Sequence, residues 1–146
     1  MDVKEKARCL EQLKYLKREV DMLSQRIAGL DPTARGGAGG IAGLPGGFTP
    51  ADGPEAEKLA ALRRRLEARR GRCMDLLGAL YTFIDDIDDS LIRQILTYRY
   101  IYDETWREVA ARIGEKDEQY PRRLHNRFLQ GVRVPSFAEP YGEDGL

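Results

Sequence analysis

Several features that mark common classes of protein are scarce or missing in this chain of 146 residues. No stretch approaches the roughly 20 uncharged apolar residues that a membrane-spanning helix needs. Residues 1–6 also lack the apolar core of a secretory signal peptide. These absences exclude a membrane protein and predict a cytoplasmic location.

The residues that catalysis and metal binding most often use are also few. The two cysteines, Cys9 and Cys73, match no metal-ligand spacing, and we expect both to be reduced. The sole histidine, His125, has no serine, cysteine or carboxylate partner at an identifiable spacing. The acidic run 85–89 fits a DDxxD metal motif superficially, but a second acidic cluster is missing, so a helix junction with a cap is favoured. We therefore expect no enzymatic activity, no metal and no cofactor.

Net charge is zero, because 24 lysines and arginines balance 24 acids. This balance argues against a protein that coats nucleic acid indiscriminately. The distribution is uneven, however. No acid occurs between Gln119 and Val134, a segment that holds four arginines: Arg122, Arg123, Arg127 and Arg133.

Apolar residues recur at steps of three and four over two long segments, which predicts an all-α protein with coiled-coil-like helices. The first arm helix is expected within residues 1–30 and the second over 54–87. Between them, residues 31–53 form a glycine-rich segment that is predicted to be a flexible loop. The two arms are therefore expected to form a long antiparallel hairpin.

One register of this hairpin pairs every heptad layer, with paired residue numbers that sum to 82. It places Leu23 against Leu59 and Cys9 against Cys73. It also leaves the far end of the second helix beyond the first, so we expect that end to pack on the C-terminal module. Pairing of the arms between molecules, as a homodimer or higher oligomer, remains an alternative.

The C-terminal residues 88–134 are predicted to form a module of three helices, followed by a mobile tail over 135–146. Asp88, Asp89 or Ser90 can cap the first helix. Thr105 and Glu108 have capping-box spacing at the start of the second helix, and Gly114 ends it. The expected core and capping residues of the module are Thr105, Trp106, Glu108, Leu124 and Phe128.

A short helix, a glycine-bearing turn and a third helix rich in Arg, Asn and Gln are typical of a helix-turn-helix that reads the DNA major groove. Arginine recognises guanine, Asn or Gln recognises adenine, and other arginines neutralise phosphates. We expect Arg122, Arg123 and Asn126 nearest the bases, and Arg127 and Arg133 at phosphates. The full set of candidate DNA-binding residues is Gln119, Arg122, Arg123, His125, Asn126, Arg127 and Arg133.

Pro121 leaves the start of this third helix open, because proline is tolerated only in the first turn of a helix. Either the helix begins at Asp117 or Glu118 and accepts Pro121 near its fourth position, or it begins at Pro121 after a longer turn. The second choice would move Gln119 out of the groove.

Three segments, 91–101, 105–110 and 122–129, resemble region four of bacterial sigma factors, which binds the promoter −35 element. The layout of arm, loop, arm and helix-turn-helix over residues 8–130 is similar to phage-encoded sigma-like proteins of the ArpU and RinA type. This resemblance implies a phage or prophage regulator of late transcription in a bacterial host cell, with double-stranded DNA as its partner and RNA polymerase as a second candidate partner. Pro121 departs from the pattern, where an apolar residue is usual.

Two other functions fit the same elements. The chain could be a small terminase subunit that marks phage DNA for packaging and forms a ring through its arms. It could also be an adaptor that binds RNA polymerase or another protein, with little affinity for DNA. Solution mass and DNA binding distinguish these functions from transcriptional regulation.

A second basic cluster lies on the second arm helix between Arg63 and Arg72. We expect these arginines to pair with acids of the first helix, Glu11, Glu19 and Asp21. The alternative is a second stripe that contacts phosphates without reading sequence.

Overall fold

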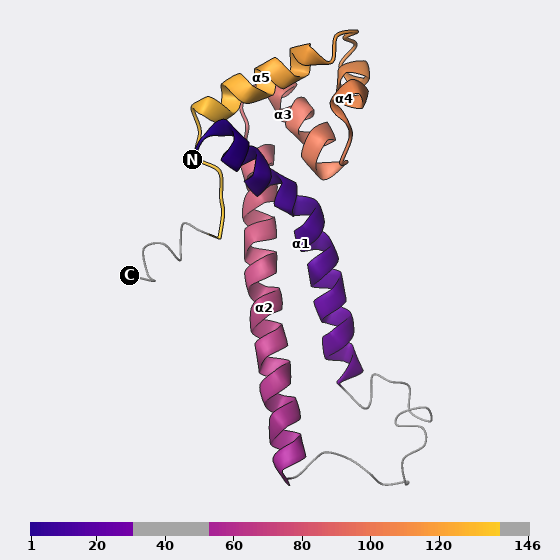
Figure 1. The fold of residues 1–146 in the computed structure, drawn as a ribbon, viewed down its shortest axis with the longest axis vertical. Coiled ribbons are helices and arrows are strands. Elements are labelled where there is room, and N and C mark those ends of the chain that lie inside the picture. The colour runs from indigo at the N-terminus through magenta and orange to yellow at the C-terminus, as the bar shows by residue number, and fades with distance from the viewer. Residues whose placement is uncertain (31–52, 138–146) are drawn as a thin grey trace. The chain divides into compact units, whose positions relative to one another are not determined.

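The computed structural model describes residues 1–30 and 53–137, and within these ranges it contains helices and no strand. This confirms the predicted all-α class. The long helices α1 (Val3–Gly29) and α2 (Gly53–Asp85) are followed by α3 (Ser90–Leu96), the π-helical turn η2 (Thr97–Ile101), α4 (Trp106–Arg112) and α5 (Gln119–Gln130) (Figure 1). Residues 31–52 of the predicted loop and 138–146 of the predicted tail lie outside the described residues.

The starts of the helices follow from local sequence. At α1, the Asp2 amide donates to Glu5 Oε2 over 3.0 Å and the Glu5 amide donates to Asp2 Oδ1 over 2.8 Å, so two N–H groups at the helix start are satisfied. At α3, the Ile92 amide donates to Asp89 Oδ1 over 3.1 Å, which confirms a cap at the acidic junction. None of the described helices is both long and apolar enough to cross a membrane.

The chain divides into two compact units, and both long helices are shared between them. Unit 1 contains residues 1–17 and 75–146, and unit 2 contains residues 18–74. The predicted boundary between arms and module, after residue 87, therefore does not coincide with the division into units. The C-terminal helices share their unit with the first half of α1 and the last turns of α2.

In unit 2, α1 and α2 contact each other in antiparallel order. Arg70 Nη1 donates to Ser24 Oγ over 3.3 Å. The Cys73 thiol donates a hydrogen bond to Glu19, and burial, together with the negative charge of Glu19, raises the pKa of that thiol. These pairs have residue numbers that sum to 94 and 92, so the predicted register with a sum of 82 is wrong. Cys73 meets Glu19 instead of Cys9, a shift of ten residues, or about 15 Å along a helix.

In unit 1, the last turns of α2 pack on the C-terminal helices. Leu80 and Ile84 are fully buried, and the rings of Phe83 and Phe128 are 6.1 Å apart between centroids. This contact confirms that the far end of the second helix packs on the C-terminal module. Within the module, α5 contacts both α3 and α4.

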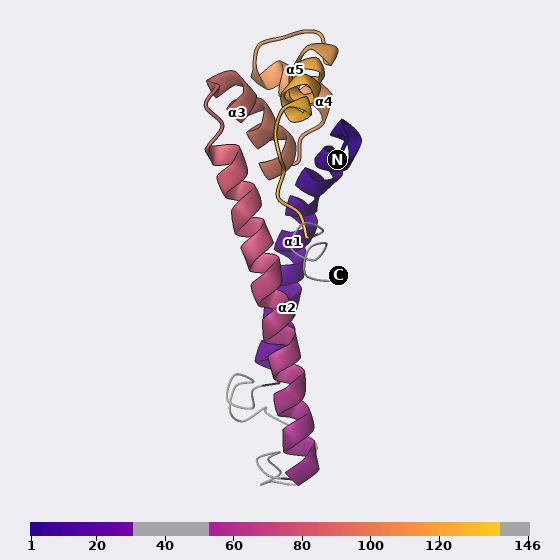
Figure 2. The ribbon, with the colours of Figure 1, turned by 90° about the vertical axis from the view of Figure 1, so that its left-hand side faces the viewer.

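The first turns of α1 also reach this module, which the sequence analysis missed. Lys6 Nζ donates to the Leu129 carbonyl oxygen near the end of α5 over 2.6 Å, and Lys14 lies 3.4 Å from Asp103 Oδ1. Figures 1 and 2 both show the N-terminus beside the C-terminal end of α5. A lysine at the last carbonyls of a helix is favourable, because that end carries partial negative charge.

Candidate nucleic-acid interface

The start of α4 is fixed by the predicted capping box. The Glu108 amide donates to Thr105 Oγ1 over 3.2 Å, and the Thr105 amide donates to Glu108 Oε1 over 3.0 Å. The backbone hydrogen bond from Thr105 lowers the pKa of Glu108, because it favours the ionised carboxylate. The roles predicted for Thr105 and Glu108 are confirmed.

The segment between α4 and α5 ends one helix and begins the next. Gly114 has φ +81°, a conformation that side chains rarely adopt, so the glycine predicted to end α4 is required there. Asp117 then accepts hydrogen bonds from two amides of α5. The Gln119 N–H donates to its Oδ1 over 2.9 Å, and the Tyr120 N–H donates to its carbonyl oxygen over 3.2 Å. Pro121 follows as the third helical residue, where a missing N–H costs little.

Pro121 also belongs to the buried stripe of α5. Pro121, His125 and Leu129 are buried at a spacing of four residues, whereas the predicted anchors Leu124 and Phe128 are only partly buried. The core face of α5 is therefore rotated by about one residue from the prediction. From the sequence, Leu124 and Phe128 were the obvious apolar residues of this helix, and His125 was taken for a polar surface residue. The buried face through His125 was therefore not predicted.

His125 is 3% exposed and does not belong to a DNA-contacting surface, which corrects the prediction. Its Nδ1 lies 2.9 Å from Asn126 Oδ1, an acceptor, so Nδ1 carries the proton. Its Nε2, 2.6 Å from the Tyr100 hydroxyl, then accepts a hydrogen bond. Burial lowers the pKa of His125 to about 4, and the imidazole is neutral at pH 7.

Trp106 closes the other side of this histidine. Its ring meets the imidazole edge-on at 4.8 Å between centroids, and the Arg99 guanidinium lies 4.8 Å from the Trp106 ring centroid. Trp106 is only partly buried, as are Leu124 and Phe128, so it borders the module core through its contact with His125. These aromatic and polar contacts join η2, α4 and α5 around one histidine.

Glu104 and Arg112 form a second polar contact that the sequence did not reveal. Arg112 donates to Glu104 Oε2 through Nη2 over 2.9 Å and through Nε over 3.1 Å. Glu104 is nearly buried, and its carbonyl accepts from Arg99 Nη1 over 2.9 Å. The pair fixes the loop before α4 to the end of α4. In the sequence, Glu104 lies eight residues before Arg112. Side chains that pair within a helix are three or four residues apart, so this spacing did not predict the contact.

The opposite face of α5 is exposed and contains no acid. Four of the predicted DNA-binding residues on this helix are exposed and Asn126 is partly buried; the exposed ones are Gln119, Arg122, Arg123 and Arg127. At 100° per residue, the centre of this face holds Gln119, Arg123, Asn126 and Gln130, and Arg122 and Arg127 lie at its two edges. Five of the seven predicted residues therefore share one surface.

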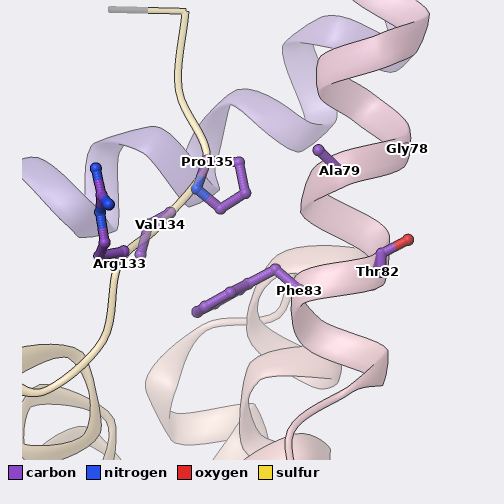
Figure 3. A pocket seen from close by; sticks show the side chains of 7 residues that line it. All are labelled: Gly78, Ala79, Thr82, Phe83, Arg133, Val134 and Pro135. Atoms are coloured by element: carbon purple, nitrogen blue, oxygen red, sulfur yellow. The ribbon is translucent and has the colours of Figure 1, made fainter. Parts of the chain in front are cut away.

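The remaining predicted residue, Arg133, lies apart from this face. It follows the end of α5 and lines an open groove against α2, together with Thr82, Phe83 and Val134 (Figure 3). Because Val134 is fully buried, the chain after α5 is held against α2 at this point. The structure does not group Arg133 with the arginines of α5.

No metal site accompanies these residues: within 1–30 and 53–137, no group of three His, Cys, Asp or Glu side chains is arranged to hold an ion. Comparison with known proteins gives no match to a family model, a curated protein or a solved structure.

Proposed function

We propose that this protein binds double-stranded DNA in a sequence-specific way, with α4 and α5 as a helix-turn-helix and α5 in the major groove. The observation that carries the proposal is the exposed, acid-free face of α5, whose opposite side is anchored by Pro121, His125 and Leu129. A helix that reads bases needs this combination, because the rigid buried side fixes the position of the donors on the other side. Six residues separate Arg112 from Gln119, a longer turn than the usual three or four.

The position of each side chain on α5 suggests its role. Gln119 and Arg123 are exposed at the centre of the face, Asn126 lies partly buried beside them, and all three would meet base edges. Arg122 and Arg127, at the edges of the face, would meet the phosphates on either side of the groove, so the base contact expected of Arg122 from the sequence is replaced by a phosphate contact. The Asn126 oxygen already accepts from His125, so its amide nitrogen supplies the donors for a base.

The biological role that we propose is transcriptional regulation in a phage or prophage, on the sequence resemblance to sigma region four and to ArpU-type and RinA-type proteins. Packaging by a terminase-like ring and adaptor binding to RNA polymerase predict different properties. A ring would have a solution mass of many subunits. An adaptor would bind polymerase and leave DNA unbound.

The proposal is tested by selecting bound duplexes from a random library and then comparing variants on the enriched site. We expect Arg123→Gln to lower affinity by roughly 1 to 3 kcal/mol and to relax preference at one base pair. We expect Arg122→Gln and Arg127→Gln to weaken all sequences alike and to reduce the salt slope by about 0.9 each. Failure to enrich any sequence, with unchanged binding in all three variants, would refute the α5 interface.

A finer prediction concerns Asp117, whose Oδ2 lies 3.8 Å from Arg123 Nη1. This exposed ion pair competes with DNA for the arginine. We expect Asp117→Asn to tighten duplex binding severalfold, since exposed pairs of this kind are worth about 0.2 to 1 kcal/mol. The asparagine keeps an Oδ1 acceptor for the Gln119 amide, so the start of the helix is retained.

Fluorescence anisotropy with a labelled duplex measures this change. Glu115→Gln is the matched control, because Glu115 is an exposed acid of the same turn. If both variants tighten binding equally, general charge accounts for the gain and the specific release of Arg123 is ruled out.

A further inference from the structure

The most basic surface outside α5 lies on the part of α2 that belongs to unit 2. Residues 58–72 contain seven basic residues and one acid, Glu67, in a chain whose net charge is zero. Six of the seven are arginines. Like charges on neighbouring turns of a helix repel one another and destabilise the helix. A role in binding an anionic partner would account for an excess that lowers stability.

Three residues of this surface, Lys58, Arg65 and Arg69, lack the predicted pairing with the acids of α1 in the described part of the protein. No hydrogen bond or ion pair joins Lys58, Arg65 or Arg69 to another side chain in the described part of the protein. Glu19 is engaged with the Cys73 thiol. Since Lys58, Arg65 and Arg69 are also exposed, they present full charges to solvent.

These side chains share one line along the helix. We define the basic stripe as Lys58, Arg65, Arg69 and Arg72, which follow one another at steps of seven, four and three residues. At 100° and 1.5 Å per residue, the stripe covers about 60° of the helix and extends over roughly 21 Å. The single acid, Glu67, projects from the opposite side. The stripe therefore offers a row of positive charges to an extended anionic partner.

The chemistry of the stripe favours nucleic acid over a lipid surface. Arginine forms bidentate hydrogen bonds with phosphate, and it predominates over lysine here. Helices that lie on membranes insert large apolar side chains, especially Trp, Phe and Leu. In the described residues of unit 2, the large apolar side chains that are exposed are Met22 and Met74, and neither is aromatic.

We infer that the basic stripe of α2 is a second, sequence-independent DNA site that binds the phosphodiester backbone of a duplex. This site is independent of base reading by α5. A duplex carries one negative charge per about 1.7 Å of its axis, so the stripe spans enough phosphates for several contacts. Such contacts increase affinity without changing sequence preference.

The experiment measures binding of the full chain to a labelled duplex of mixed sequence over a series of salt concentrations. We expect the variant K58Q/R65Q/R69Q to bind at least tenfold more weakly at low salt. We also expect a log-log salt slope lower by about 0.9 for each contact removed. Glutamine has nearly the helix propensity of lysine and arginine, and circular dichroism checks that folding is retained.

The matched control is R8Q/K17Q/R18Q, which removes three exposed basic residues from α1. Equal loss in both triple variants would overturn the inference, because net charge alone would then explain it. Retained duplex binding, with loss of binding to vesicles that contain phosphatidylserine, would also overturn it and identify a lipid site. The variant R122Q/R123Q/R127Q separates the two proposals: binding that persists there and is lost only when the stripe is also changed supports the stripe even if α5 reads no DNA.

Discussion

Leu129→Ala is expected to lower the free energy of unfolding by about 3 kcal/mol, whereas Leu124→Ala should cost about 1 kcal/mol. Leu129 is fully buried on the face that packs α5 against the rest of the module, and Leu124 is only partly buried. Truncation at the first position leaves a cavity among rigid neighbours, while truncation at the second removes less contact. Urea unfolding followed by circular dichroism measures both values.

The pair is internally matched, because both substitutions replace leucine with alanine within one helix and change helix propensity equally. The comparison therefore reports burial alone. Equal costs, or a larger cost at Leu124, would contradict the rotation of α5 that places Pro121, His125 and Leu129 inward. The outward direction of Arg123 and Asn126 depends on the same rotation.

Acidification from pH 7 to pH 5 is expected to remove about 2 kcal/mol of stability through His125. Its pKa falls from an ordinary 6.5 to about 4 in the folded protein, so the unfolded chain binds the proton more tightly. The stabilisation is complete above pH 6.5 and is lost as the pH falls toward 4. Unfolding at a series of pH values measures the slope.

His125→Gln supplies the control for this pH dependence. Glutamine can still hydrogen-bond Tyr100 but does not titrate, so the change in stability between pH 7 and pH 5 should become small even if the variant is less stable throughout. The chain has no other histidine, and the lowered pKa of Glu108 acts at lower pH. An unchanged slope in the variant would show that His125 is not the group responsible.

Features determined by near neighbours were predicted well. The cap at Asp89, the capping box of Thr105 and Glu108, and the end of α4 at Gly114 all involve groups within a few residues of each other. The position of Pro121 was harder to predict, because proline suits the first turn of a helix and its ring can also be buried in the core face. The structure places it in the first turn of a helix that begins at Gln119, near the first of the two predicted alternatives.

The register of the two long helices could not be predicted from the heptads. A repeat of three and four residues matches itself after each shift of seven or so, so several registers bury leucine on leucine with similar free energy. Contacts from other parts of the chain decide among them. Lys6 on the Leu129 carbonyl and Lys14 on Asp103 need α1 to reach the C-terminal helices, and both lie more than 80 residues from their partners in sequence.

By itself, the sequence determined that the protein is helical, where α3 and α4 begin, that α4 ends at Gly114, and that an acid-free arginine segment lies on the last helix. These properties depend on periodicity, capping and composition, which act over one or two helical turns. Only the tertiary structure decided which face of α5 is buried, that His125 is a neutral core residue, and that Glu19 rather than Cys9 meets Cys73. Those outcomes depend on desolvation and packing by distant residues, and spacing along the chain carries no record of them.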